Sequence, residues 1–283
     1  ASSIKARISG VGCVTVSLRK SIIFVLLTKI QFRMDVLLQL LVFILVPFLG
    51  ALATFFTGFG LNTILVPVFL LYWDAPIAVL MAGTVHLCNN ILKVALTARS
   101  INWNLFQNFG IPAIIFAFLG AFLLSTLTAN TTTNLEPIFG VILMGFACLE
   151  FFNWKLPIQG KWAMRFGGVL SGFFGGFSGH QGALRAMFLS KLKIEPLVFV
   201  ATTAIISLLV DMTRISVYFS STALFNYYPT LLIFLCVPAA LAGTLVGKKY
   251  IPKVNHAKLS MIVGIGLFVM GLIMLLKSLI PFH

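Results

Sequence analysis

The sequence predicts an all-α polytopic membrane protein, built from two inverted repeats of about five helical segments each. The first observation behind this fold class is the composition: 60% of the 283 residues are hydrophobic and only 9% are charged. A soluble globular domain carries roughly 25% charged residues. The second observation is the mean hydropathy of +1.07. Such a chain lacks the polar residues to cover a water-facing surface, which excludes a soluble enzyme, a disordered protein and a secreted disulfide scaffold.

Ten apolar segments follow Met34, and a helix needs about 20 apolar residues to span a bilayer. Two of the segments are unusually short, and each follows a glycine-rich turn. We therefore expect one short broken helix in each repeat. The first set comprises residues 36–56, 61–73, 76–98, 105–127 and 135–152. The second set comprises residues 162–174, 182–192, 196–219, 227–247 and 259–279.

The chain divides into a basic N-terminal segment, residues 1–33, and two repeats, residues 34–160 and 161–283. The N-terminal segment carries six Lys or Arg and no acid. Its apolar part, residues 21–30, is too short to span a bilayer. We expect this segment to lie outside the fold, as a targeting segment, an interfacial anchor or sequence upstream of a start at Met34.

The loops predict the orientation, because cytoplasmic loops collect Lys and Arg. If every segment crosses once, all the basic loops lie in the cytoplasm and both ends of the core lie outside. Joining each short segment to its neighbour gives eight crossings instead and places some basic loops outside. We expect a multi-pass protein of the plasma (inner) membrane. The basic loops are those at Arg99, 153–161, 191–193 and 248–258, and the loops without Lys or Arg are those at Asp74, 129–134 and 220–226.

An internal repeat supports the division into two halves. Residues 50–60, GALATFFTGFG, resemble residues 168–178, GVLSGFFGGFS. Two further small-residue patches recur in the same order in the second half. An odd number of crossings in each repeat inverts the second repeat relative to the first. Inverted repeats with interrupted helices are typical of secondary transporters, whose binding site lies near the bilayer midplane.

Three stretches carry a resemblance to a known family. They are residues 57–67, TGFGLNTILVP, residues 171–185, SGFFGGFSGHQGALR, and residues 201–214, which contain ATT and LVDMTR. Over about residues 34–280 the chain resembles the TauE/SafE family of sulfite and organosulfonate exporters. The resemblance implies export of a small sulfur oxyanion or organosulfonate without fixing which one. The chain departs from the family pattern in its first turn, which has no long run of glycines.

The glycine-rich turns are the predicted anion-binding site. A helix N-terminus presents unpaired N–H groups and roughly half a positive charge, and glycine lets the backbone approach an anion closely. Close helix packing is the alternative role of these glycines. For Arg185, which follows the second turn, the alternative is that its side chain extends to the membrane surface. The candidate substrate-binding residues are Gly58, Gly60 and Asn62 in the first repeat and Gly176, Ser178, Gly179, His180, Gln181 and Arg185 in the second.

Ionisable residues at membrane depth are costly and are candidates for gating or proton coupling. The spacing of His86, Asn90 and Lys93 places them on one helix face, which we expect to point to the interior. Asp211 and Arg214 are three residues apart and share a face. Interhelical hydrogen bonds and an intrahelical ion pair are the structural alternatives. The gating or coupling candidates are His86, Asn90, Lys93, Asp211 and Arg214.

These features favour a secondary transporter that works by alternating access, with the anion held at the glycine-rich turns of the two repeats. The sequence has no nucleotide-binding P-loop, so ATP is not the driver, and proton coupling and downhill flow both stay open. An anion channel is one alternative. The string GFSG at 176–179 suggests another, an intramembrane serine protease, which also needs a histidine on another helix beside the serine. We expect no enzyme activity, cofactor or metal. The expected partners are a small anion and the lipid bilayer, not nucleic acid, and a homodimer stays open.

Overall fold

The structure is a computed structural model in which the chain forms two compact units, residues 1–43 and residues 44–283. In the first unit residues 37–43 are helical, and several of their leucines are exposed. All regular structure in the described part of the chain is helical, which confirms the all-α class. The described residues are 37–55, 60–129, 135–152, 160–189, 192, 194–220, 230–250 and 256–279.

Five helices among the described residues are long and apolar enough to cross a membrane, which confirms a polytopic membrane protein. A further apolar helix, Met261–Lys277, is shorter. The five candidate spans are Leu37–Thr54, Ala75–Ser100, Trp103–Ala129, Pro196–Phe219 and Leu231–Lys249.

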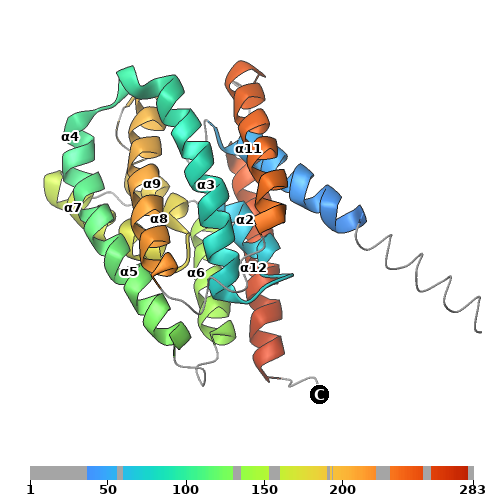
Figure 1. Ribbon diagram of the computed structural model, residues 1–283. Coiled ribbons are helices and arrows are strands. Elements are labelled where there is room, and N and C mark those ends of the chain that lie inside the picture. The colour runs from blue at the N-terminus through green and yellow to red at the C-terminus, as the bar shows by residue number, and fades with distance from the viewer. Residues whose placement is uncertain are drawn as a thin grey trace, which may run out of the picture. The chain divides into compact units, whose positions relative to one another are not determined.

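The second unit follows the predicted order of segments (Figure 1). Two short helices, α2 (Asn62–Phe69) and α8 (Gln181–Leu189), lie where the sequence predicts broken helices. Each is followed by a long helix, α3 (Ala75–Thr97) or α9 (Pro196–Phe219), with a proline in its first two positions. Proline suits that position because the missing N–H has no partner within the helix there. The remaining long helices are α6 (Glu136–Phe152), α7 (Lys161–Phe177), α11 (Thr230–Tyr250) and α12 (His256–Leu279).

The fourth segment is not the single regular helix that its apolar run predicts. It follows the 3-10 turn η1 (Ala98–Ser100) and begins with one α-helical turn, α4 (Trp103–Leu105). A π-helical turn, η2 (Phe106–Gly110), comes next, and α5 (Ile111–Ala129) completes the segment. Such a π turn changes the helix register locally, a feature that apolar periodicity does not encode.

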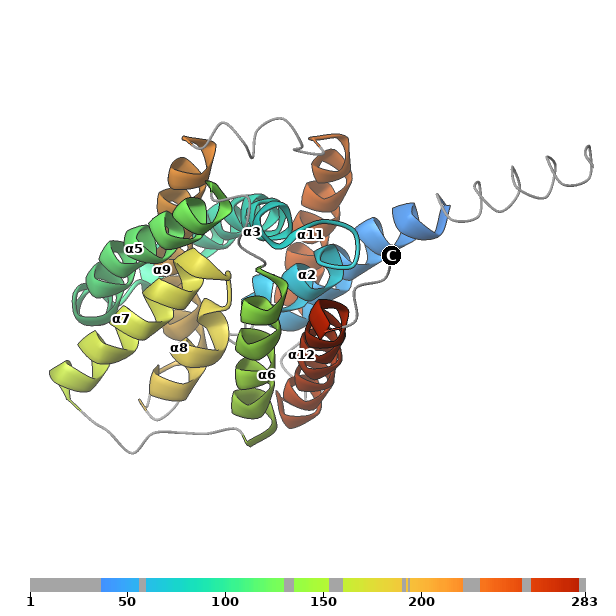
Figure 2. The ribbon, with the colours of Figure 1, turned by 90° about the horizontal axis from the view of Figure 1, so that it is seen from below.

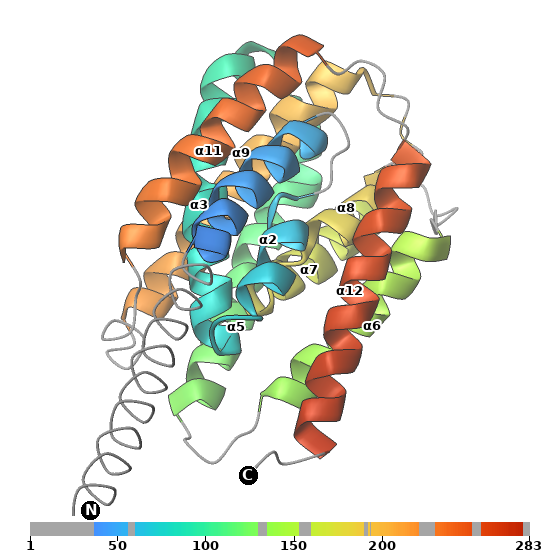
Figure 3. The same cartoon turned by 90° about the vertical axis from the view of Figure 1, so that its right-hand side faces the viewer.

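The helices of the second unit pack in pairs: α5 along α7, α6 along α12 and α3 along α9 (Figures 1 and 2). In Figure 3, which shows the right-hand side of Figure 1, α12 lies along α6. In addition, α5 contacts α9 and α3 contacts α11, while α2 contacts α12 and α8 contacts α6.

Glycines bring α7 onto α5. Gly168, Gly172 and Gly176 are four residues apart, and a Cβ added to any of them would overlap a backbone carbonyl of α5 or η2. Small residues at such spacing are the usual means by which helices in membranes approach closely. In this structure Gly176 therefore makes a packing contact with α5. Close helix packing is the role that the sequence left open for it beside anion binding.

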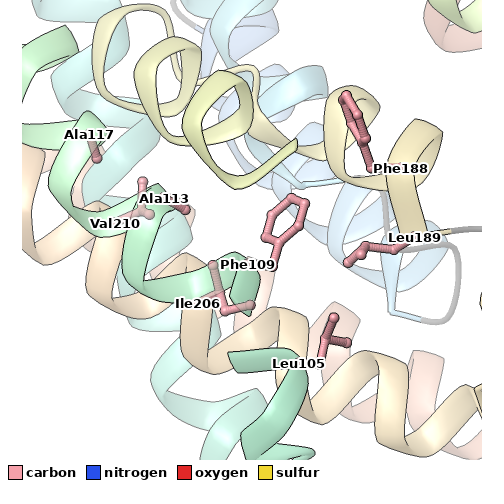
Figure 4. Packing of buried hydrophobic residues seen from close by; sticks show 8 residues of the cluster. All are labelled: Leu105, Phe109, Ala113, Ala117, Phe188, Leu189, Ile206 and Val210. Carbon is pink, nitrogen blue, oxygen red and sulfur yellow. The ribbon is translucent and has the colours of Figure 1, made fainter. Parts of the chain in front are cut away.

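A buried apolar cluster joins the start of the α4–α5 segment to α8 and α9 (Figure 4). Phe109 and Ile206 lie near its centre and are fully buried. The cluster holds α8 in place, because Phe188 and Leu189 at its C-terminal end belong to it. Its members are Leu105, Phe109, Ala113, Ala117, Phe188, Leu189, Ile206 and Val210.

The second unit has many apolar side chains on its surface and several charged ones in its interior. On α5, Ile115, Phe118 and Phe122 are 50–57% exposed. The charged side chains of Lys93 and Arg185 are at most 6% exposed. This distribution suits a protein surrounded by lipid, in which ionisable residues face the bundle interior.

Candidate functional site

Two polar stripes face each other across the α3–α9 contact. On α3 the stripe contains His86, Asn90 and Lys93, all at most 6% exposed, which confirms that this face points to the interior. On α9 the stripe runs from Thr203 through buried polar residues at helical spacing to Arg214. Because α3 and α9 pack along each other, the two stripes can satisfy one another's hydrogen bonds.

Asp211 is the centre of this network. Its Oδ2 accepts hydrogen bonds from His86 Nδ1 at 2.6 Å and from Asn90 Nδ2 at 3.2 Å. Its Oδ1 lies 2.8 Å from Nη2 of Arg214, so the two residues that share a helix face form an ion pair. A buried carboxylate is tolerated only with such partners, since an isolated ionised group is costly to desolvate.

Arg214 ties three helices together. Its Nη1 donates to the Gly175 carbonyl of α7 at 3.4 Å. Its Nη2 donates to the side-chain oxygen of Asn62 on α2, in the amide orientation that also lets Asn62 donate to the Ala82 carbonyl at 2.8 Å. The guanidinium lies over Gly83 of α3, where a Cβ would come within 2.8 Å of Nη2. Both terminal nitrogens of Arg214 therefore hold neighbouring helices, while its Nε has no partner among the described residues.

The second glycine-rich turn is the break between α7 and α8. The N–H groups of Ser178 and Gly179 both donate to the Phe174 carbonyl, at 2.9 and 3.0 Å. Gly179 has a φ of +82°, and a Cβ there would lie 2.8 Å from Nη1 of Arg214. Both its conformation and its surroundings therefore require glycine.

His180 follows this turn and points away from the α3–α9 network. Its ring stacks on Phe146 of α6 with centroids 5.2 Å apart. Its Nδ1 donates to the Ser178 carbonyl at 2.9 Å, while Nε2 has no hydrogen-bond partner among the described residues. The Ser178 hydroxyl donates to the Phe174 carbonyl at 3.1 Å. His180 Nδ1 also lies 3.3 Å from Ser178 Oγ, but both groups already donate to carbonyls. This geometry gives no support to a serine–histidine pair aligned for proteolysis, in which the histidine must accept the hydroxyl proton.

A small cavity of about 20 Å³ lies where α3, α8 and α9 meet the first glycine-rich turn. On this measure a cavity needs roughly 10–15 Å³ to hold one water, so the space is closed to anything much larger. Its wall combines polar side chains of α3 and α9 with Phe55, Val200 and Ala204. The lining residues are Thr54, Phe55, Gly60, His86, Asn90, Lys93, Arg185, Val200, Thr203, Ala204 and Ser207.

Three hydrogen bonds hold Arg185 in the cavity wall. Its Nη1 donates to the Thr203 carbonyl at 3.0 Å and to the Ser207 hydroxyl at 2.7 Å. Its Nη2 donates to Gln181 Oε1 at 2.6 Å. Its Nε has no partner within the described ranges. The bonds fix the guanidinium against α9 and exclude snorkelling, while leaving one N–H without an acceptor.

Lys93 is the second cation of the cavity wall. It is 6% exposed, and its Nζ lies 5.7 Å from the centre of the Phe55 ring. Neither Lys93 nor Arg185 has a carboxylate within ion-pair distance in the part of the chain that the structure describes. The cavity thus has two cationic side chains in its wall and no acidic one.

The family model described as Sulfite exporter TauE/SafE matches residues 42–274. The chain belongs to the sulfite exporter TauE/SafE family. The match confirms the resemblance predicted from the glycine-rich turns, and with the apolar helices it makes the protein a multi-pass membrane transporter. Every residue that lines the cavity lies within the part that matches the TauE/SafE model. Comparisons with curated proteins and with solved structures found no match.

Within this TauE/SafE transporter, the predicted site residues fall into three groups. One group lines the cavity, and a second holds the wall or the helices around it without lining it. Gly58 lies outside the described residues. The lining group is Gly60, His86, Asn90, Lys93 and Arg185. The surrounding group is Asn62, Gly176, Ser178, Gly179, His180, Gln181, Asp211 and Arg214.

Sequence reasoning missed Ser207, which accepts a hydrogen bond from Arg185 and lines the cavity. The sequence does contain a signal for Ser207, because polar residues recur every four positions along α9, at Thr203, Ser207 and Asp211. Such a spacing places all three on one helix face. An apolar helix with a continuous polar face is expected to present that face to the interior.

Proposed function

We propose that this transporter exports a small sulfur oxyanion or organosulfonate, which binds between Lys93 and Arg185. The observation that carries the proposal is the composition of the cavity wall, with two cationic side chains and no acidic one among the described residues. An anion at about 4 Å from a cation gains about 4 kcal/mol at an effective dielectric constant of about 20. A cation in the same place would be repelled by comparable amounts from both sides.

Unsatisfied donors support the same class of cargo. Arg185 Nε and Gln181 Nε2 are buried nitrogen atoms without hydrogen-bond partners in the described structure. Buried donors are nearly always bonded, so an acceptor-rich group is a fitting guest. The oxygens of a sulfite or sulfonate would supply acceptors, and α8 adds the positive end of its helix dipole.

The cavity supports a carrier more than an open pore. At about 20 Å³ it has room for roughly one water and not for a sulfite, so binding requires the surrounding helices to move. Alternating access would supply that movement, with the substrate reaching the cavity from one side at a time. Gly60 of the first turn lines the cavity, and Gln181 after the second turn holds Arg185, so both turns would take part.

The helix contacts support two structurally equivalent repeats. In the two repeats α2 corresponds to α8, α3 to α9, α5 to α11 and α6 to α12. When the repeats are exchanged, the α5–α9 contact therefore becomes the α11–α3 contact. In the same way the α2–α12 contact becomes the α8–α6 contact. All four contacts are present. The exchange leaves the α3–α9 and α6–α12 pairs unchanged, as expected for elements beside a pseudo-two-fold axis. Inverted repeats related by such an axis, with both ends of the core outside, are the arrangement that we propose.

The test is transport into proteoliposomes with radiolabelled sulfite and, in parallel, methanesulfonate. Lys93→Met and Arg185→Gln should each lower the apparent affinity about ten- to 100-fold, since a hydrogen bond to a charged group contributes about 1.5–3 kcal/mol. Lys277→Met and Arg165→Gln are matched controls, because both side chains are exposed. Cavity variants that transport like the controls would refute the site. Wild-type flux that does not saturate would favour the channel, and no flux of either anion would refute the proposed cargo.

A further inference from the structure

His86 connects the buried carboxylate to the cavity through its two ring nitrogens. Nδ1 donates to Asp211 Oδ2 at 2.6 Å, so in the neutral ring Nε2 carries the lone pair. Nε2 is directed to the first glycine-rich turn, where a Cβ on Gly60 would lie 3.6 Å from it. Both His86 and Gly60 line the cavity. In this tautomer Nε2 accepts a long hydrogen bond from the amide nitrogen of Asn90, at 3.4 Å, which protonation of Nε2 would replace.

The charged groups around His86 come from three helices. Lys93 lies on its own helix, Arg185 comes from α8, and Asp211 and Arg214 come from α9. From α2, the neutral side-chain amide of Asn62 lies 3.3 Å from His86 Nδ1. Since Asp211 is already paired with Arg214, a proton on His86 would add a further positive charge beside Lys93 and Arg185. An anion in the cavity would offset that charge, and by linkage the proton would strengthen anion binding equally.

We propose that His86 is the proton-coupling residue, and that one proton is carried with each anion through protonation of Nε2. This inference rests on the proposed function as an anion transporter. When the cavity is open to one side, an O–H bond of a hydronium ion breaks and the Nε2–H bond forms, while Nδ1–H continues to donate to Asp211. When the cavity opens to the other side, the Nε2–H bond breaks and the proton returns to water with the departing anion. No other group changes its proton count.

The imidazole is suited to this step for two reasons. It is the side chain that ordinarily gains and loses a proton between about pH 5 and 8. Its ring also keeps one hydrogen bond fixed while the other nitrogen exchanges a proton, so the α3–α9 contact persists in both states. His180, which is also buried, has no described contact with a carboxylate and does not line the cavity.

The experiment follows anion uptake and internal pH together in proteoliposomes that contain a pH-sensitive dye. Methanesulfonate is the probe, because it stays ionised and carries no proton itself, and protein-free liposomes give the leak. In the wild type, uptake should acidify the lumen, and a gradient of one pH unit should change the accumulation ratio of the anion about tenfold. In His86→Gln, which retains an amide donor for Asp211, uptake should persist with a lower apparent affinity, without acidification and without response to the gradient. His180→Gln should retain the wild-type ratio of protons to anions.

The outcomes separate this inference from the proposed function. Wild-type uptake without proton movement overturns the proton coupling and leaves anion transport in place. A proton-to-anion ratio in His86→Gln equal to that of the wild type also overturns it. If His180→Gln lost the proton coupling and His86→Gln kept it, His180 would be the coupling residue. That result would refute the assignment to His86. Absence of saturable uptake in the wild type refutes the proposed function itself. The wild-type measurement decides the coupling even where a variant fails to fold.

Discussion

Alanine in place of Gly179 tests how the break between α7 and α8 is built. The residue has a φ of +82°, a conformation that costs an L residue about 1–2 kcal/mol. The new Cβ would also lie 2.8 Å from Nη1 of Arg214. That guanidinium is fully buried and held by Asp211, so displacing it should cost a further amount of about 1–3 kcal/mol. We expect Gly179→Ala to destabilise the protein by about 2–5 kcal/mol in total.

Gly160→Ala is the matched control for this prediction. Gly160 has a φ of +107°, and a Cβ there would meet nothing within 4 Å. Its ψ of 172° places it in a backbone region that only glycine adopts readily, so Gly160→Ala carries a backbone cost of its own without a side-chain contact. A lower Tm of Gly179→Ala would then come from the added contact with Arg214. At about 2–4 °C per kcal/mol for a chain of this size class, Gly179→Ala should melt several degrees below Gly160→Ala in the same detergent. A Tm of Gly179→Ala equal to that of the wild type would refute the proposed crowding of Arg214.

Three further predictions concern single contacts. Ser207→Ala removes the hydroxyl that accepts from Arg185 at 2.7 Å, so the apparent KM for sulfite in proteoliposomes should rise about tenfold; an unchanged KM would contradict this position of Arg185. Gly172→Ala forces α7 off the backbone of α5 and should cost at least about 1–3 kcal/mol, whereas Gly145→Ala, with open space around it, should stabilise α6 by about 1 kcal/mol; Tm shifts of the same sign would refute the packing. The Thr244 hydroxyl of α11 donates to the side-chain oxygen of Asn89 on α3 at 2.6 Å. Thr244→Val removes this donor and should lower the free energy of unfolding by about 1–3 kcal/mol, which the same thermal melt measures.

The fold class could be predicted because lipid imposes strict rules on composition. Runs of apolar residues predicted the helices, and the two short runs after glycines predicted α2 and α8. The polar face containing His86 and Lys93 was placed in the interior for the same reason, since such groups are costly in lipid. The π turn at Phe106–Gly110 was not predictable, because it changes the backbone register without changing the apolar pattern.

The structure brings together only some of the predicted site residues, because neighbours in sequence need not point the same way. His180 directly follows the glycine-rich turn, yet its ring stacks on Phe146 rather than lining the cavity. It lies in an irregular link between two helices, where helical periodicity gives no direction for the side chain. Ser207 was missed for the opposite reason. It follows the helical periodicity of α9, but a lone serine in an apolar helix is a weak signal until Arg185 is seen to bond it.

The two buried arginines differ in a way that only the structure reveals, and the difference bears on the cargo. Both lie in helices at membrane depth, so sequence alone gives them the same priority. Arg214 is paired with Asp211, and its two terminal nitrogens bond Gly175 and Asn62. Arg185 has only neutral hydrogen-bond partners. The Nε of each arginine lacks a partner within the described residues, so the difference lies in the carboxylate. Since an unpaired buried cation is costly, a protein that retains one beside a cavity gains most when an anion arrives, and this makes Arg185 rather than Arg214 the residue on which substrate affinity should depend.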